Sequence, residues 1–117
     1  METKQVGEKL VSLCREGKNM QAIDELYSPE IVSVEAEVPQ GMEKEMRGLD
    51  AVKQKNKWWF ENAEIHSHSA EGPFVNGDRF AVLFDYDVTS HGKRTQMREV
   101  ANYDVKDGKI VREEFLS

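Results

Sequence analysis

Two glutamates in the last third of the chain fall among apolar side chains, where a carboxyl group could transfer a proton. If residues 79–89, 95–105 and 109–116 form strands, alternation puts Glu99 and Glu113 on the apolar face of the sheet. An ionised carboxylate is costly there unless it is paired or hydrated. The pattern therefore predicts a polar-lined pocket for general acid–base catalysis. The alternative is that both groups lie in water at the open end of the sheet. The apolar residues of this face are Phe80, Val82, Phe84, Tyr86, Met97, Ala101, Tyr103, Val111 and Phe115.

The turn between the first two strands decides which side chains meet. The segment Ser90-His91-Gly92-Lys93 suits a tight hairpin turn, and this turn pairs Phe84 with Glu99. Tyr86 and Tyr103 then point to the same face as Glu99. Each tyrosine is either a pocket hydrogen-bond donor or a core aromatic with a bonded hydroxyl group.

The last turn leaves two registers open. A three-residue turn at Lys106-Asp107-Gly108, with the glycine in the left-handed region, pairs Tyr103 with Val111 and points Glu113 inward. This is the register we expect. A two-residue turn at Asp107-Gly108 would slip the strand by one residue and turn Glu113 outward.

Helices are expected upstream of these strands. Apolar residues recur at three- and four-residue spacing in residues 4–16 and 19–28, which indicates two helices. Asn19 is the expected N-cap of the second helix, and Pro29 cannot continue it. A third helix is expected to begin with Asp50 as its N-cap.

Two further strands are expected before the last third of the chain, one on each side of the third helix. Residues 31–38 alternate and are rich in Val and Ile, which indicates a strand that ends at Pro39. Residues 40–47 are polar and read as a loop. Residues 63–69 have strand character, and Gly72-Pro73 indicates a bulge or bend after them.

Two adjacent tryptophans and a lone cysteine belong to the expected helices. Trp58 and Trp59 lie about 100° apart on a helix, so we expect one to pack on the sheet and the other to reach the rim or a partner subunit. Cys14 falls beside Leu10 and Leu13. A lone cysteine can be a nucleophile, but core packing is the expected role here.

Two histidines share one face of the expected strand at residues 63–69. In the simplest register of the Asn76-Gly77 hairpin, His66 and His68 oppose Asp87 and Asp85 on the outer face. A bulge between the histidines and the hairpin would turn them into the pocket instead. A zinc site needs three or four ligands, so we expect no metal.

Composition and charge narrow the class of protein. At 117 residues the chain is expected to form one domain, residues 1–117. Sixteen Lys and Arg against 22 Asp and Glu give a net charge of -6, which argues against a nucleic-acid partner. No segment has the ~20 apolar residues of a membrane span, and the N-terminal residues are polar. A lone cysteine fits a cytoplasmic location.

The order of these elements resembles the nuclear transport factor 2-like fold, and within it the SnoaL-like domain proteins. The resemblance covers the whole chain and implies an α+β fold: a cone-shaped barrel of a curved, mixed or antiparallel sheet wrapped around three N-terminal helices. The segments that carry it are Leu26-Tyr27-Ser28-Pro29-Glu30-Ile31-Val32-Ser33-Val34-Glu35, Gly48-Leu49-Asp50-Ala51-Val52, Gly72-Pro73-Phe74-Val75-Asn76-Gly77-Asp78 and Val105-Lys106-Asp107-Gly108-Lys109-Ile110-Val111.

The resemblance also implies candidate chemistry. Ketosteroid isomerase, a relative in this superfamily, uses a carboxylate base at the end of its first strand, and Glu35 matches that position. Its oxyanion donors do not carry over, because Leu10 and Ala101 occupy their positions. SnoaL-type cyclases use a pocket acid or base on a substrate that its own carbonyl groups activate. Glu35 is alternatively an exposed strand end, with Val32 and Val34 pointing inward.

These observations favour a cofactor-independent isomerase, cyclase or dehydratase acting on a small apolar molecule. The alternatives are a non-catalytic small-molecule binding module and a dimeric interaction domain. We expect a homodimer through the outer face of the sheet, where Asp85 opposes Arg98. The expected catalytic residues are Glu35, Glu99 and Glu113, and the expected substrate contacts are Tyr27, Trp59, His66, Tyr86, Tyr103 and Phe115.

Overall fold

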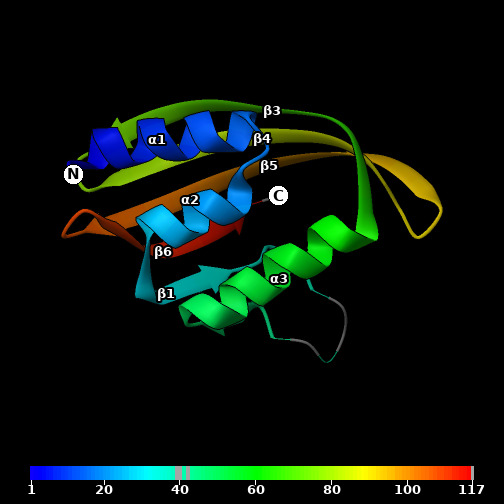
Figure 1. The fold of residues 1–117 in the computed structure, drawn as a ribbon, viewed down its shortest axis with the longest axis horizontal. Helices are drawn as coiled ribbons and strands as arrows, with labels where there is room; N and C mark the ends of the chain where they lie inside the picture. Colours follow the sequence, from blue (N-terminus) through cyan, green and yellow to red (C-terminus); the bar gives the residue numbers. More distant parts are fainter. Residues whose placement is uncertain (39–40, 42, 117) are drawn as a thin grey trace.

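The computed structural model describes residues 1–38, 41 and 43–116 (Figure 1). Within these residues, three helices and six strands follow one another in the order α1-α2-β1-β2-α3-β3-β4-β5-β6, so four strands come after the last helix. The helices are α1 (Thr3–Arg15), α2 (Asn19–Leu26) and α3 (Leu49–Asn62). The strands are β1 (Tyr27–Val34), β2 (Glu45–Arg47), β3 (Ala63–Asn76), β4 (Arg79–Ser90), β5 (Lys93–Lys106) and β6 (Lys109–Leu116).

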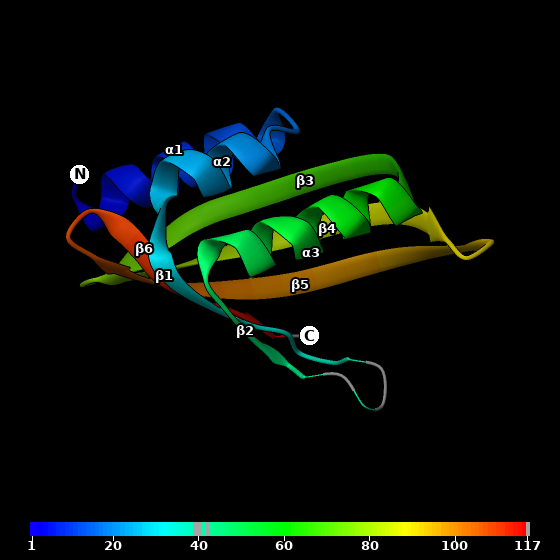
Figure 2. The same ribbon diagram turned by 60° about the horizontal axis from the view of Figure 1, so that its bottom comes forward.

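The six strands form one curved sheet in the order β2-β1-β6-β5-β4-β3. All neighbours are antiparallel except β1 and β6, which are parallel, so the sheet is mixed. The three helices lie on one face of this sheet (Figures 1 and 2). The α+β cone architecture expected from the sequence is therefore confirmed. The cone is open rather than a closed barrel, because β2 and β3 are the two edges of the sheet.

The helices begin and end close to the expected residues, but two caps differ. Gly17 has a φ of +75° directly after the end of α1, as expected of a C-terminal glycine. The N-cap of α2 is Lys18 rather than Asn19, which is the first helical residue. The N-cap of α3 is Gly48, and Asp50 lies in the first turn of the helix. A negative charge there interacts favourably with the helix dipole.

The first strand begins and ends four residues earlier than the sequence predicts. The backbone becomes extended at Tyr27, directly after α2, and strand β1 ends at Val34 instead of residue 38. Pro29 is tolerated because pairing with β6 is interrupted between Tyr27 and Val32. The expected loop at residues 40–47 contains the short strand β2, which pairs with β1. The expected stop at Pro39 lies outside the described residues.

The register between β4 and β5 agrees with the sequence-based expectation. Phe84 pairs with Glu99, and Asp85 pairs with Arg98 on the outer face. The turn residues His91 and Gly92 have φ values of +53° and +75°, which a tight hairpin turn requires. Glu99 therefore lies on the face that the helices cover.

The prediction of a three-residue turn between β5 and β6 is wrong, yet the side chain of Glu113 still points inward. Lys106 pairs with Lys109 across a two-residue turn. A β-bulge then leaves Val111 without a partner, because pairing jumps from Val105–Ile110 to Asp104–Arg112. The extra residue restores the alternation, so Glu113 pairs with Tyr103 and is buried. Ile110, rather than Val111, fills the core.

The expected bulge at Gly72-Pro73 is present in β3. The register with β4 shifts between Glu71 and Phe74, and Gly72 has a φ of +131°. A side chain at Gly72 would meet the carbonyl oxygen of Ala81, because a Cβ atom would lie 2.9 Å from it. Only glycine fits this close approach.

The core lies between the helices and the inner face of the sheet. Its largest fully buried residues come from both layers: Leu10 and Leu26 from the helices, Ile31, Tyr103 and Ile110 from the strands. Among the described residues, no helix has the length and apolar character needed to cross a membrane. The core does not fill the space under α3, where a cavity opens.

Candidate active site

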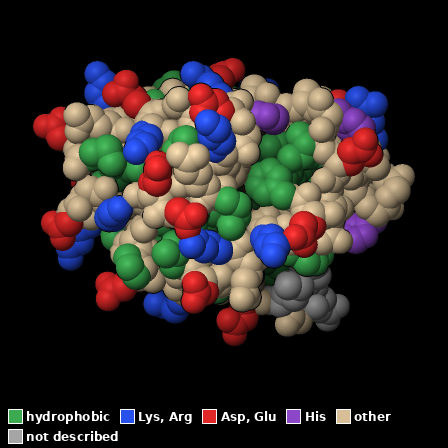
Figure 3. All heavy atoms as spheres, viewed as in Figure 1, with side chains coloured by type: hydrophobic (Ala, Val, Ile, Leu, Met, Phe, Trp, Pro, Cys, Tyr) green, Lys and Arg blue, Asp and Glu red, His purple; other side chains and the backbone are tan. Residues whose placement is uncertain are grey.

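A cavity of about 470 Å³ lies between the three helices and the inner face of the sheet. This volume falls in the range of small-molecule sites. Hydrophobic side chains are visible in a hollow between α1–α2 and α3, with charged groups near its rim (Figure 3). The cavity is lined by Leu10, Cys14, Asn19, Ile23, Tyr27, Glu35, Ala36, Glu37, Lys55, Asn56, Trp59, Phe60, Phe84, Tyr86, Met97, Arg98, Glu99, Tyr103, Glu113 and Phe115.

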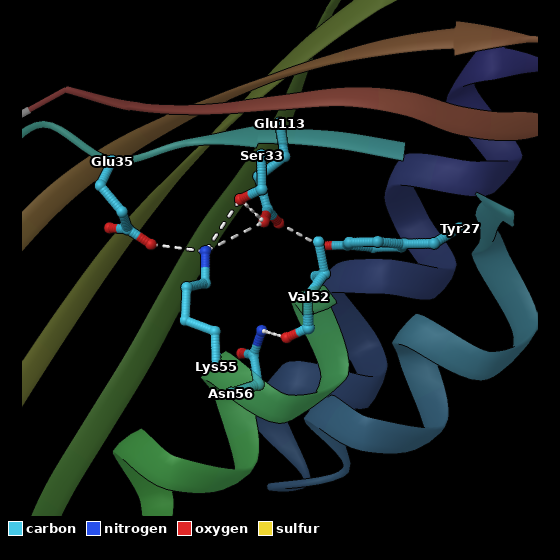
Figure 4. Close-up of polar contacts among 7 residues, drawn as sticks. All are labelled: Tyr27, Ser33, Glu35, Val52, Lys55, Asn56 and Glu113. Atoms are coloured by element: carbon cyan, nitrogen blue, oxygen red, sulfur yellow. Dashed lines mark hydrogen bonds and ion pairs between the residues drawn. The ribbon is translucent and has the colours of Figure 1, made fainter. Parts of the chain in front are cut away.

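Lys55 of α3 is the centre of a polar cluster on one wall of the cavity (Figure 4). Its ammonium group lies 2.5 Å from Oε1 of Glu35 and donates a hydrogen bond of 2.8 Å to Ser33. It is also 4.0 Å from Oε1 of Glu113 and 5.2 Å from the centre of the Phe115 ring. Lys55 thus joins α3 to β6 and to the end of β1.

Glu113 is held at the buried end of this cluster. Its side chain is 3% exposed, and it accepts hydrogen bonds from the hydroxyl groups of Tyr27 and Ser33. Burial raises the pKa of Glu113, and Lys55 and the two hydrogen bonds oppose that shift. Burial and the nearby Glu113 carboxyl group also raise the pKa values of Tyr27 and Tyr103. Both tyrosines therefore keep their protons. The hydrogen bonds from Tyr27 and Ser33 hold the Glu113 carboxyl group in place.

Glu99 faces the same cavity but is not fixed in this way. Among the described residues, no side chain forms a hydrogen bond or ion pair with its carboxyl group. Burial raises the pKa of Glu99, as does the charge of Glu35, while Lys55 lowers it. A carboxyl group with a raised pKa is a stronger base when it is ionised. Glu99 thus presents to the cavity a carboxyl group that no described side chain engages.

Aromatic rings form another part of the cavity wall. Trp59 packs edge-on against Tyr86 at 5.3 Å between ring centres and against Phe60 at 5.0 Å. Phe84 stacks against Tyr86 at 6.3 Å. Trp58, the residue before Trp59, is 56% exposed. The expected division of roles between the two tryptophans is present, with Trp59 turned inward and Trp58 turned outward.

The structure brings eight of the nine expected site residues to the cavity. These are Tyr27, Glu35, Trp59, Tyr86, Glu99, Tyr103, Glu113 and Phe115. His66 does not line it: its side chain is exposed, and Nε2 lies 2.8 Å from Oγ1 of Thr89. The pairing of β3 with β4 is irregular at His66, between Ile65 and Ser67. The bulge at Gly72-Pro73 places His68 opposite Tyr86, whose ring it stacks on at 6.1 Å.

Sequence reasoning missed the lysine and the serine at the centre of the cluster. Lys55 is three residues after the buried Val52 and four before Trp59, so its helical spacing alone places it on the inward face. An inward lysine near carboxylates signals an ion pair. Ser33 carried no comparable signal, because a serine in a strand is common on either face.

Two other expectations concern cysteine and metal chemistry. Cys14 is buried, and burial raises its pKa to about 12, so its thiol is a poor nucleophile at neutral pH. Within residues 1–38, 41 and 43–116, no group of three or more His, Cys, Asp or Glu side chains is arranged to hold a metal ion.

Comparison with known proteins gives one family for the whole chain. The sequence model of the SnoaL-like domain family matches residues 1–117. A crystal structure from Mesorhizobium loti, described as a candidate SnoaL-like polyketide cyclase and also as a carbohydrate phosphatase, is 39% identical. The match covers 100% of both chains with a TM-score of 0.93. No functionally curated protein matches the chain.

More distant structures share the fold. A Xanthomonas campestris protein of unknown function with a cystatin-like fold is 19% identical, with a TM-score of 0.82 over 100% of this chain and 91% of its own. A candidate isomerase from Bacillus subtilis is 18% identical, with a TM-score of 0.76 over 99% of this chain and 88% of its own.

Proposed function

This chain belongs to the SnoaL-like domain family, and from that membership we propose that it is a cofactor-independent isomerase, cyclase or dehydratase. Its substrate would be a small, mainly apolar molecule with a carbonyl group, and the reaction would proceed by general acid–base catalysis. The observation that carries this proposal is the carboxyl group of Glu99, which no described side chain engages. Of the other carboxyl groups that line the cavity, Glu35 and Glu113 are both engaged, and Glu37 is exposed.

Glu99 would be the group that moves the proton. Its carboxylate accepts a proton from a carbon atom next to the substrate carbonyl group, and the electron pair passes to the carbonyl oxygen as an enolate. The carboxylic acid then returns the proton to the same or another carbon atom. Glu35, the base that the resemblance implies, lies 2.5 Å from the Lys55 ammonium group. That ion pair engages the Glu35 carboxyl group, whereas no described side chain engages the carboxyl group of Glu99.

Lys55 would stabilise the enolate. An ammonium group has three N–H donors, and contacts with Ser33 and Glu35 occupy two of them. The distance of 4.0 Å to Glu113 is too long for a hydrogen bond. One donor thus remains for a substrate oxygen. The neighbouring Phe115 ring helps to exclude water, which strengthens the electrostatic stabilisation.

The same cavity favours a second candidate function, non-catalytic binding of a small molecule. The aromatic wall around Trp59 and Tyr86 offers apolar contacts that need no chemistry. Both functions predict ligand affinity, but only the enzyme exchanges protons with its ligand. An exchange measurement therefore separates them.

Hydrogen–deuterium exchange tests the catalytic proposal without knowledge of the natural substrate. The probe is β-tetralone, a flat bicyclic ketone with acidic C–H bonds beside its carbonyl group, followed by proton NMR in D₂O. The wild-type protein should accelerate the loss of these signals, and Glu99→Gln should reduce the acceleration by about 10²-fold or more. Glu114→Gln, on the outer face, is the matched control. Acceleration that survives in Glu99→Gln would refute the proposed role, and binding without exchange would favour the binding module.

We also propose that the protein is a homodimer through the outer face of its sheet. Val100 and Leu116 pair across β5 and β6 and are 39% and 43% exposed. Leu83 pairs with Val100 from β4, so the three form one apolar strip. Analytical ultracentrifugation should find a dimer, and Val100→Lys should produce monomers. A wild-type monomer at micromolar concentration would contradict this.

We propose a cytoplasmic location for the protein. The buried Cys14 is the only cysteine of the chain, so no internal disulfide is available to it. Fractionation of cells that express the untagged protein checks this location.

A further inference from the structure

A second group of polar atoms lines the cavity, and no hydrogen bond or ion pair among the described residues joins it to the cluster around Lys55. Asn19, the first residue of α2, and Tyr86 of β4 both line the cavity. The Tyr86 ring is held by three neighbours: Trp59 edge-on at 5.3 Å, and His68 and Phe84 stacked at 6.1 and 6.3 Å. The hydroxyl group of Tyr86 is therefore oriented before any ligand binds.

Both polar groups can donate a hydrogen bond to a ligand oxygen. Burial raises the pKa of Tyr86 to about 12, so its phenol keeps its proton at neutral pH. The Asn19 amide lies close enough to the phenol to oppose this shift. Nδ2 of Asn19 also donates to the sulfur of Cys14 at 3.5 Å. Sulfur is a weak acceptor, so an oxygen atom of a ligand would be a better partner for this amide.

Tyr86 and Glu99 reach the cavity from neighbouring strands. Tyr86 pairs with Met97 and Phe84 pairs with Glu99, so Tyr86 and Glu99 are diagonal neighbours on the inner face of β4 and β5. The Cα atoms of diagonal neighbours in an antiparallel pair are about 7–8 Å apart. A tyrosine hydroxyl group extends farther from its Cα atom than a glutamate carboxyl group does, so a ligand that contacts both groups needs two separated oxygen atoms. The side chains that flank the diagonal, Phe84 and Met97, are apolar and suit a flat hydrocarbon body.

We infer that the cavity takes a flat, apolar molecule that carries an oxygen atom at each end. Its carbonyl group lies at Glu99 and Lys55, and its second oxygen, a hydroxyl or another carbonyl group, accepts or exchanges hydrogen bonds with Tyr86 and Asn19. Tyr86 and Asn19 are thus specificity residues that fix the direction of the ligand. The placement of the carbonyl end rests on the proposed function, whereas recognition of the second oxygen does not.

Two matched probes test the inference by calorimetric titration. One is β-tetralone, and the other is its analogue with a hydroxyl group on the aromatic carbon farthest from the ketone. Wild-type protein should bind the hydroxylated probe about tenfold more tightly. Tyr86→Phe and Asn19→Ala should each reduce this preference, measured as the ratio of the two affinities in the same variant. Asn102→Ala, an exposed residue of β5, is the control and should keep the preference.

Any one of three results would overturn the inference. These are equal affinity for both probes, no measurable binding of the hydroxylated probe, and a preference that survives in both Tyr86→Phe and Asn19→Ala. Binding and exchange are separate readouts. A hydroxyl preference without deuterium exchange would refute the proposed catalysis and keep the inference. Deuterium exchange without a hydroxyl preference would support the proposed catalysis and overturn the inference.

Discussion

The hydroxyl group of Ser33 donates a hydrogen bond of 2.7 Å to Oε1 of Glu113 in the buried part of the molecule. The same oxygen of Ser33 accepts a hydrogen bond of 2.8 Å from Lys55. Ser33 is therefore the link between a buried carboxyl group and the ammonium group that faces the cavity. Its loss would leave both partners short of a hydrogen bond at once.

We predict that Ser33→Ala lowers the free energy of unfolding by about 1–3 kcal/mol, because buried polar groups lose their partner. Urea unfolding followed by circular dichroism measures the change. Ser69→Ala, at an exposed position of β3, should stay within about 0.5 kcal/mol of wild type. Equal stability of Ser33→Ala and wild type would show that the hydrogen bonds contribute nothing measurable.

The raised pKa of Glu99 predicts a dependence of stability on pH. A carboxyl group whose pKa is higher in the folded state binds more protons when folded, so its contribution to stability is complete below the ordinary value of 4.5. The contribution disappears as the pH rises through the folded pKa. The melting temperature of wild type should therefore fall relative to that of Glu99→Gln as the pH rises from about 4.5.

Thermal unfolding of both proteins between pH 4 and pH 8 measures this difference. The outer-face variant Glu114→Gln is the control, and its curve should run parallel to that of wild type. A difference between wild type and Glu99→Gln that is constant with pH, or that changes in the opposite direction, would mean that burial does not raise the pKa of Glu99.

Much of the sheet could be predicted because turn chemistry and alternation act over short distances. The pairing of Phe84 with Glu99 follows from one tight turn and the two-residue period of a strand. The bulge at Val111 could not be derived in this way. The bulge depends on which turn type forms, and the buried contacts of Glu113 and Ile110 decide between the turn types. Those contacts join segments that are far apart in the sequence.

The candidate site was predictable in its strand residues and less so in its helix residues. Alternation placed Glu99 and Glu113 inward, but the partners of Glu113 come from other elements far away in the sequence. Tyr27 was expected in a helix and instead begins β1, from where its hydroxyl group reaches Glu113. Lys55 was predictable only from its spacing to Val52 on the same helix.

The raised pKa of Cys14 predicts low thiol reactivity. A pKa of about 12 instead of 9.0 lowers the thiolate fraction at neutral pH about a thousandfold. Alkylation of the native protein by N-ethylmaleimide, followed by mass spectrometry, should be slower than alkylation of the urea-unfolded protein by a similar factor. Because Cys14 lines the cavity, a bound ligand should slow it further. Equal rates in native and unfolded protein would contradict the burial of this thiol.

The two tryptophans should respond differently to a ligand. Trp59 lines the cavity, whereas Trp58 is 56% exposed. Titration with β-tetralone should change the fluorescence of wild type and of Trp58→Phe, and the change should be absent in Trp59→Phe. A change that disappears in Trp58→Phe instead would place the ligand outside the cavity.

The dependence of the exchange rate on pH is the most direct test of Glu99 as the proton acceptor. For wild type with β-tetralone in D₂O, the protein-dependent rate should rise with pH through an apparent pKa above 4.5, because the ionised carboxylate is the base. In Glu99→Gln this pH-dependent step should vanish, while Glu114→Gln should keep it. A rate profile that is the same in wild type and Glu99→Gln would contradict the account.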